Sequence, residues 1–222
     1  MTKGGRTIVV GDVHGCYDEL SELLERAAFG AGDRLVCVGD LVAKGEKNRE
    51  VLDLFIRDAR LSSALGNHDR AVLRGLRGEA VRLKPAQEKC VQELQPEGAR
   101  YAQFLSTLPL SIDLGSHVVV HAGLRPGVAL AEQSADDLTE LRTLGPDRTS
   151  REGTPWYDVY DGERVALFGH WPAPVPRRGP RAIGLDTGCV YGYELTAYVV
   201  EEDKFLSVPA RRAYSPPGGR VG

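Results

Sequence analysis

Short apolar runs in this sequence end in clusters of aspartate, histidine and asparagine, which are metal-binding residue types. The clusters are GDVHG at 11–15, GD at 39–40, GNHD at 66–69, HAG at 121–123 and GH at 169–170. Carboxylate, imidazole and amide oxygen ligands together suit divalent ions such as Mn²⁺, Fe²⁺ or Zn²⁺. A single carboxylate such as Asp40 can bridge two ions about 3.5–4 Å apart, as two-metal hydrolases require. The candidate metal ligands are Asp12, His14, Asp40, Asn67, His121 and His170.

The prediction of a metal site depends on the clusters taken together. A lone Gly-Asp after a strand is usually a turn, and a lone histidine is more often a packed core residue. Here, however, four of the five histidines fall within such clusters. His117 has no motif around it, and we interpret it as a surface or structural residue.

The elements that position these clusters alternate between strand and helix. Apolar residues recur at helical spacing between the first apolar runs, which are short and rich in β-branched residues. Open α/β sheets place their active sites at the carboxyl ends of the strands, where these clusters stand. The pattern predicts strands at 7–10, 35–38 and 61–65, with helices at 16–28 and 47–59.

The rest of the chain continues this alternation less regularly. Residues 70–108 are predicted to be mostly helical, with Pro85 and Pro96 as breaks, and a short helix is predicted near 137–144. Further strands are predicted at 118–120, 165–168, 182–185 and 195–200, and the Pro- and Arg-rich run 172–180 is predicted to be a loop.

Length and composition are ordinary for a globular protein with one α/β domain or at most two small ones. The chain has 222 residues, 42% hydrophobic, and a formal net charge of −3, so bulk charge gives no reason to expect specific nucleic-acid binding. The four cysteines form no CxxC pair, the N-terminus lacks a signal-peptide pattern, and no apolar run is long enough to span a membrane. We therefore expect a cytoplasmic protein that does not associate with a membrane.

The succession GDVHG, GDLVAKG, GNHD, HAG and GH resembles the PPP branch of the metallophosphoesterases, from Gly11 to about Gly192. This resemblance implies an α/β fold in which two mixed sheets pack together and are flanked by helices, a four-layer sandwich. We expect a single calcineurin-like metallophosphoesterase domain at 1–210 and a flexible C-terminal tail at 211–222.

The resemblance also implies roles for the clustered residues. Asp12, His14, Asp40 and His170 would hold one metal, and Asp40, Asn67 and His121 the other. His68 matches the general acid that protonates the leaving oxygen, and a hydroxide bridging the two ions would attack phosphorus. We expect two divalent ions, Mn²⁺ first, with Fe²⁺, Co²⁺, Zn²⁺ or Ni²⁺ as alternatives.

Two departures from the motif of serine/threonine phosphatases lie next to the bridging aspartate. Ala43 stands where those enzymes have the aspartate that orients the catalytic histidine, so we expect Asp69 or a backbone carbonyl to orient His68. Lys44 replaces an arginine that clamps phosphate, which keeps the charge but loses the two parallel hydrogen bonds of the guanidinium.

Other motifs favour a particular subfamily. GDLVA, the opening GDVHGCYDEL, FGHW at 168–171 and LDTGC at 185–189 resemble the bacterial symmetrical diadenosine tetraphosphate hydrolases. That resemblance implies hydrolysis of the tetraphosphate to two ADP, with other phosphoanhydrides and phosphomonoesters as further substrates. The segment between HAG and FGHW is shorter than in those hydrolases, which suggests a more open site.

Several residues are candidates for substrate contacts. We expect Lys44, Arg142 and, as a weaker candidate, Arg125 to bind phosphate. Trp171 or Tyr191 could stack on an adenine, although a packing role is equally compatible with the pattern.

Two other functions remain as alternatives. The first is a compact bacterial protein serine/threonine phosphatase with broad activity, which would act on phosphoproteins; the short length favours it and Ala43 argues against it. The second is a non-catalytic metal-dependent binding protein. That alternative requires the loss of a ligand or of His68, and all of these residues are present.

Overall fold

Alternate residues of the central strands face opposite layers of the molecule. In β1 (Thr7–Val10), Ile8 and Val10 pack against helices, whereas Val9 packs against the second sheet. The same alternation divides β5 (His117–Val120), where Val119 faces the first sheet. Because side chains alternate along a strand, apolar residues at every position produce a sheet that is buried on both faces.

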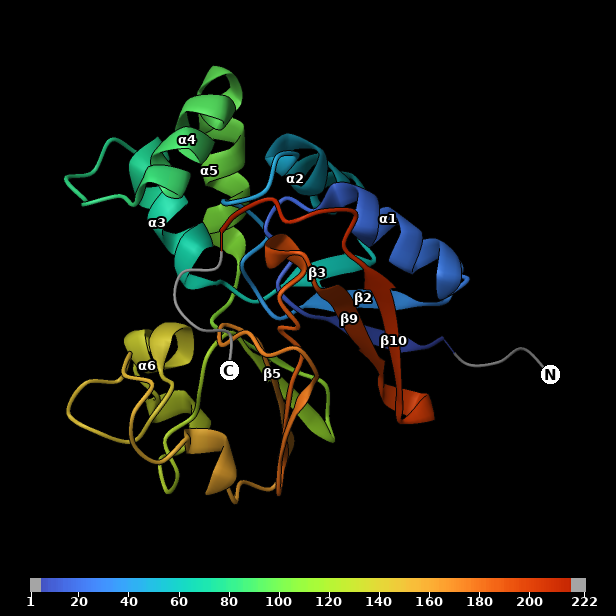
Figure 1. Cartoon of the computed structure of the whole chain (residues 1–222), viewed down its shortest axis with the longest axis vertical. Coiled ribbons are helices and arrows are strands. Elements are labelled where there is room, and N and C mark those ends of the chain that lie inside the picture. Colours follow the sequence, from blue (N-terminus) through green and yellow to red (C-terminus); the bar gives the residue numbers. More distant parts are fainter. Residues whose placement is uncertain (1–4, 217–222) are drawn as a thin grey trace.

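The computed structural model describes residues 5–216 and contains two five-stranded mixed sheets (Figure 1). The first has the order β10-β9-β1-β2-β3, in which β1, β2 and β3 are parallel and β9 and β10 are antiparallel additions. Its other strands are β2 (Arg34–Cys37), β3 (Leu61–Ser63), β9 (Glu194–Val199) and β10 (Lys204–Pro209).

The second sheet has the order β4-β5-β6-β8-β7, with β5, β6 and β8 parallel and an antiparallel strand at each edge. Its further strands are β4 (Ser111–Asp113), β6 (Val165–Phe168), β7 (Arg177–Gly179) and β8 (Ala182–Gly184). A core that includes Val9, Val36 and Leu167 lies between the two sheets.

Helices cover the outer face of the first sheet. Residues of α1 (Tyr17–Arg26), α2 (Asn48–Arg57), α3 (Asn67–Leu76), α4 (Pro85–Leu94) and α5 (Gly98–Thr107) share one core with β1 and β2. On the other side, α6 (Ala135–Glu140) and the segment around Trp156 cover the second sheet (Figure 1). Short 3₁₀ turns lie at Gln95–Glu97, Leu130–Glu132, Trp156–Asp158, Cys189–Tyr191 and Val200–Glu202. The predicted single α/β domain with two mixed sheets and flanking helices is confirmed.

The structure corrects the prediction of a loop over 172–180. Residues Arg177–Gly179 form β7, which pairs antiparallel with β8 at the edge of the sheet. Two further strands, β4 and β10, were not predicted. An edge strand of three residues among prolines shows no alternation in the sequence, because its pairing comes from the neighbouring strand.

The helical region after β3 also differs in detail. Helix α3 begins at Asn67 rather than near residue 70, so the GNHD motif forms its first turn. Pro85 starts α4 instead of breaking a helix, since proline is well suited to a first helical position. Helix α6 ends at Glu140, four residues earlier than the predicted end at Leu144.

The C-terminal segment up to residue 216 contacts the first helix. The backbone N–H of Arg211 and the hydroxyl of Tyr214 both donate to Glu19, at 2.9 and 2.7 Å. The flexible tail predicted at 211–222 stays a prediction. Its last residues, 217–222, lie outside the described residues. Over residues 5–216, no helix has the length and apolar character needed to cross a bilayer.

Candidate metal centre

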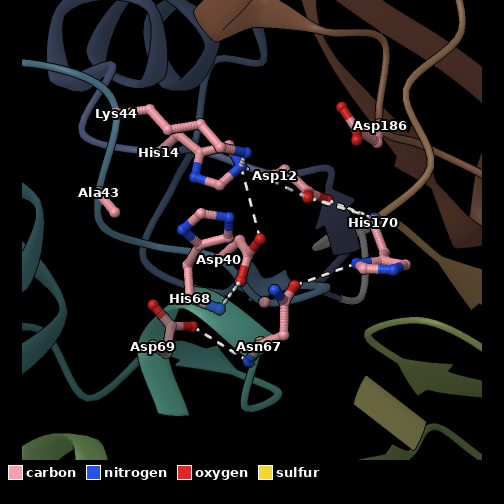
Figure 2. A network of polar contacts seen from close by, with 12 residues as sticks. Asp12, His14, Asp40, Ala43, Lys44, Asn67, His68, Asp69, His170 and Asp186 are labelled. Atoms are coloured by element: carbon pink, nitrogen blue, oxygen red, sulfur yellow. Dashed lines mark hydrogen bonds and ion pairs between the residues drawn. The ribbon is translucent and has the colours of Figure 1, made fainter. Parts of the chain in front are cut away.

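The six candidate metal ligands come together where the parallel strands of both sheets end. Asp12 and His14 follow β1, Asp40 follows β2, and Asn67 lies one turn beyond β3. From the second sheet, His121 follows β5 and His170 follows β6, the neighbouring parallel strand. Figure 2 shows five of these side chains converging from separate segments of the chain: Asp12, His14, Asp40, Asn67 and His170.

Asp40 lies at the centre of the group. Its Oδ2 is 3.5 Å from Nε2 of His14 and also 3.5 Å from Nε2 of His121. Its Oδ1 accepts a hydrogen bond from the backbone N–H of His68 at 2.9 Å. One carboxylate therefore stands between two histidines from different sheets, as a bridging ligand must.

His14 is held with one nitrogen toward the centre. Its Nδ1 lies 3.1 Å from the carbonyl oxygen of Val42, so this nitrogen carries the proton and donates it. Nε2 is then an acceptor, 3.9 Å from Oδ2 of Asp12 and 2.8 Å from Nζ of Lys44. A backbone carbonyl that fixes the imidazole in this way is the usual support for a metal-binding histidine.

The side chain of His170, which we predicted to share the first metal with Asp12 and His14, lies next to Asn67 and His121. Nδ1 of His170 and Nε2 of His121 each lie 3.0 Å from Oδ1 of Asn67, and the two rings are 5.1 Å apart. Asp12, His14 and Asp40 form a separate group whose ligand atoms lie within 4.8 Å of one another. The chain turns sharply after β6, which brings the ring of His170 to Asn67 while its backbone N–H donates to Asp12.

Burial raises the pKa of the carboxyl groups at the centre. Asp12 is 4% and Asp40 2% exposed, and desolvation raises the pKa of Asp40 to about 6. Burial, with the nearby charges of Asp186 and Asp40, also raises the pKa of Asp12 well above its usual value. Desolvation raises the pKa of Asp186 itself to about 6. A buried cluster of carboxylates needs compensating positive charge.

Burial has the opposite effect on the histidines. It lowers the pKa of His121 to about 3 and the pKa values of His14 and His170 well below the usual value. These imidazoles are therefore neutral at physiological pH, which is the form that binds metals.

The backbone around the centre adopts unusual conformations. His14, Asp40, Ala43, Lys44 and His170 all have positive φ, from 47° to 71°. Left-handed conformations are unfavourable for residues with a Cβ atom and persist where the surrounding structure enforces them. Three of these residues, His14, Asp40 and His170, are candidate ligands. The left-handed backbone at these positions directs their side chains toward the centre.

The residues present fit divalent metals. Nε2 of His121 and Nδ1 of His170 both lie 3.0 Å from Oδ1 of Asn67, and Nε2 of His121 also lies 3.5 Å from Oδ2 of Asp40. Neutral imidazole nitrogens and oxygens that converge on one buried point are the arrangement that a bound ion would satisfy. Carboxylate, imidazole and amide oxygen atoms in one buried group match the preferences of Mn²⁺, Fe²⁺ and similar ions.

His68 lies beside the metal ligands, in the first turn of α3, and its ring packs edge-on against that of His14 with centroids 5.0 Å apart. The prediction that Asp69 orients it has no support in the hydrogen bonds: the Asp69 carboxylate accepts the backbone N–H groups of Val42 and Gly66, at 3.2 and 3.1 Å. Nδ1 of His68 instead lies 3.3 Å from Nε2 of Gln87, a residue that sequence reasoning missed.

A cavity of about 570 Å³ opens over the centre. Lys44 and Arg142, two of the three predicted phosphate-binding residues, line it together with His68 and Tyr191. Its remaining cations, Lys84 and Arg151, were not predicted; they come from the start of α4 and from a loop after α6. The distribution of basic residues around the metal ligands suits an anion with several phosphates.

Arg125 does not belong to this cavity. Its guanidinium donates two hydrogen bonds to Asp137, at 2.8 and 2.9 Å, and it lines a different hollow beside Val128. The bidentate pair fixes the guanidinium of Arg125 against α6, away from the cavity in which it was predicted to bind phosphate. Trp171, 8% exposed, packs against Arg177 and Tyr157 as a wall of the core.

This arrangement matches that of known proteins. The pattern of the calcineurin-like phosphoesterases matches residues 5–205. The chain belongs to this family. Family membership accounts for the metal ligands at the strand ends, and it makes the protein a metal-dependent phosphoesterase.

Curated relatives of this phosphoesterase include two kinds of bis(5'-nucleosyl)-tetraphosphatase. The asymmetrical enzyme PrpE of Bacillus subtilis is 30% identical over 93% of this chain and 95% of its own length. The symmetrical enzyme of Vibrio campbellii is 29% identical over 92% of this chain and 98% of its own length.

Solved structures agree with these relatives. A structure described as a candidate diadenosine tetraphosphatase is 34% identical, with a TM-score of 0.78, and covers 94% of this chain and 95% of its own. A protein serine/threonine phosphatase from Saccharomyces cerevisiae shares the fold, with a TM-score of 0.68 at 15% identity, over 97% of this chain and 82% of its own.

Proposed function

We propose that this phosphoesterase hydrolyses dinucleoside tetraphosphates, with symmetrical cleavage of diadenosine tetraphosphate to two ADP as its main reaction. The observation that supports this most is the cavity, which is lined by Asp40, Asn67 and His170 of the candidate metal centre, by His68 and by four cationic side chains. A single phosphomonoester needs fewer cations than a chain of four phosphates.

In this proposal the centre holds two divalent ions, with Mn²⁺ expected ahead of Fe²⁺, Co²⁺, Zn²⁺ or Ni²⁺. Asp12, His14 and Asp40 hold one ion, and Asp40, Asn67, His121 and His170 hold the other. The bound ions supply Lewis acidity, which lowers the pKa of water and neutralises charge on phosphoryl oxygens.

The protein's own side chains then bind and orient the substrate. Nε2 of His14 has one lone pair, so Lys44 must release it when a metal binds and becomes available to phosphate. Arg142 reaches the cavity with its Nη1 tied to the carbonyl of Thr149 at 2.9 Å. Within residues 5–216 its buried Nε has no hydrogen-bond partner, which leaves this donor for a phosphate oxygen.

His68 assists departure of the leaving group, and Tyr191 offers an aromatic face to a nucleobase. Lys84 lies at the start of α4, close to the His68 side of the cavity, and would bind the phosphates of the departing nucleotide. We also place the protein in the cytoplasm, where nucleoside polyphosphates are found and where four unpaired cysteines persist.

Asymmetrical cleavage to AMP and ATP is a second candidate. The relatives named as asymmetrical are 26–31% identical to this chain. The alignment with one of them is 230 residues long, whereas the alignment with a symmetrical relative is 269 residues long. The shorter alignment indicates fewer insertions relative to this chain. The two reactions need the same metals and differ in which phosphorus lies at the centre.

Product analysis distinguishes these reactions. The Mn²⁺-loaded protein is incubated with diadenosine tetraphosphate, a phosphoserine peptide or p-nitrophenyl phosphate, and early products are resolved by ion-exchange chromatography. Two ADP per tetraphosphate, formed much faster than the peptide is dephosphorylated, is the expected result. AMP with ATP would overturn the symmetrical mode alone, and turnover of the peptide alone would establish the protein-phosphatase alternative.

A further inference from the structure

Gln87 connects the start of helix α4 to the imidazole of His68. Its side chain is buried, with the residue 3% exposed. Oε1 accepts the backbone N–H of Lys84 at 2.9 Å, and Nε2 lies 3.3 Å from Nδ1 of His68. Gln87 is the third residue of the helix, where a glutamine side chain can accept the N–H of the preceding cap residue.

The cap determines which way the amide of Gln87 points. If its oxygen and nitrogen were exchanged, the NH₂ group would face the N–H of Lys84, and two donors would meet in a buried place. The amide therefore keeps its NH₂ group toward His68 and donates to Nδ1. A nitrogen that accepts a hydrogen bond has no proton, so the neutral ring carries its proton on Nε2.

The side chains of Ala43 and Asp69 do not form this contact. At position 43 the methyl group of alanine offers no hydrogen bond, and the carboxylate of Asp69 already accepts two backbone N–H groups. Gln87 approaches the same imidazole from a different element, the start of α4, and with a donor in place of an acceptor.

We propose that Gln87 is a positioning residue that holds His68 with its proton on Nε2, the nitrogen left to the cavity that His68 lines. This inference rests on the proposed function, in which His68 assists the leaving group. An oxygen of water bonds to phosphorus and loses its proton to solvent, while the bond to the leaving oxygen breaks and its electron pair stays on the departing nucleotide. The Nε2–H group donates a hydrogen bond to that oxygen.

The arrangement also favours one class of leaving group. A hydrogen bond from a neutral imidazole is sufficient assistance for a nucleoside phosphate, because this leaving group departs as a stable anion. It is not sufficient for an alkoxide such as that of serine, which needs a proton to depart. Gln87 would therefore act as a specificity determinant for phosphoanhydrides.

The tautomer of His68 can be observed directly by long-range ¹H–¹⁵N NMR on the full chain loaded with diamagnetic Mg²⁺, with His68→Asn to assign the signal. We expect the Nε2–H pattern in the natural protein. Gln87→Glu keeps an acceptor for the N–H of Lys84, so the helix start is preserved, but it faces Nδ1 with an acceptor and should shift the ring to the Nδ1–H pattern. An Nδ1–H pattern in the natural protein, or no change in Gln87→Glu, would overturn the proposal.

Kinetics tests the consequence. Gln87→Met has nearly the same shape without the amide, and we expect kcat for diadenosine tetraphosphate to fall about 10-fold while KM and metal content stay unchanged. For p-nitrophenyl phosphate, whose leaving group also departs as a stable anion, kcat should fall by a similar factor.

Gln133→Met is the matched control, because Gln133 also accepts a backbone N–H, that of Arg125 at 2.9 Å, but lies away from the catalytic cavity. An unchanged kcat on both substrates in Gln87→Met, or a change in KM alone, would contradict the positioning role. The NMR measurement needs no turnover, so it remains decisive for Gln87 even if the tetraphosphate proves not to be the substrate.

Discussion

At the scale of single residues, Asp40 connects the two halves of the centre. Its Oδ2 lies 3.5 Å from histidines that belong to different sheets, and its Oδ1 is fixed by the backbone N–H of His68. The same carboxylate therefore contacts both groups of ligands and the start of the helix that carries the proposed acid. A change at Asp40 should disturb both metals at once.

We expect Asp40→Asn to reduce bound metal to below two ions per chain and to lower kcat by at least about 100-fold, because an amide bridges two cations poorly. Metal content after gel filtration and steady-state kinetics measure both effects. Asp203→Asn is the control, since Asp203 also has a positive φ, 49°, but lies in a turn between β9 and β10. Two tightly bound ions in Asp40→Asn would argue against a bridging role.

His68 has a different role from the ligands, and its substitution should show this. His68→Asn is expected to lower kcat for diadenosine tetraphosphate about 10²-fold, the lower end of the range for acid–base assistance because the ring donates a hydrogen bond to the leaving oxygen, while two metals remain bound. His117→Asn should leave kcat unchanged, because His117 lies at the start of β5, at the opposite end from the centre. Loss of metals in His68→Asn would refute the role assigned to it.

At the scale of elements, the strand ends approach one another so closely that side chains are excluded. A Cβ atom on Gly66 would lie 2.1 Å from Oδ1 and 2.2 Å from the backbone nitrogen of Asp40. A Cβ atom on Gly169 would lie 1.9 Å from Oδ1 of Asp12. Gly66 and Gly169 are thus required by close packing between strand ends, whereas Gly15 and Gly39 also have a positive φ, of 70° and 120°.

Gly66→Ala should therefore destabilise the fold by about 2–3 kcal/mol and reduce metal binding, because the new methyl group displaces the loop that carries Asp40. Urea unfolding with and without Mn²⁺ measures the change. Gly145→Ala is the matched control, since a Cβ atom there meets nothing within 4 Å. Equal free energies of unfolding for the two variants would show that the loop accommodates the methyl group without a loss of stability.

At the scale of the whole molecule, the buried centre makes stability depend on pH when metals are removed. Desolvation raises the folded pKa of Asp40 and Asp186 to about 6, and that of Asp69 to about 7, against about 3.9 in an unfolded chain. Such groups favour folding at low pH, and this contribution is lost as pH rises through the folded pKa. Buried histidines with a lowered pKa act in the opposite sense, but only below their unfolded pKa of about 6.5.

We therefore expect the Tm of the metal-free protein to fall as pH is raised from about 6.5 to about 8. Mn²⁺ compensates the same carboxylates, so it should raise Tm, and by more at the higher pH. Differential scanning calorimetry with chelator or with Mn²⁺ measures both quantities. A metal-free Tm that rises over this interval would contradict the linkage.

The central elements were predictable because their signals are local. Strands β1 and β6 match the predicted ranges, since a run of buried apolar residues marks a strand whatever its partners are. The edge strands β4, β7 and β10 and the start of α3 were not predicted. Their form depends on a neighbouring strand or on the turn before them, neither of which has a pattern within the segment itself.

The sequence by itself determined the chemistry of this protein: aspartate, asparagine and histidine at successive strand ends predict a site for divalent metals, and the resemblance of their motifs to the metallophosphoesterases predicts hydrolysis of a phosphoester. Only the tertiary structure decided which of these residues contact one another. It grouped His170 with Asn67 and His121, bound Arg125 to Asp137, and brought Gln87 to His68. The physical reason is that a motif specifies which atoms can bind, whereas their partners come from segments far away in the chain, whose positions are set by the packing of two sheets.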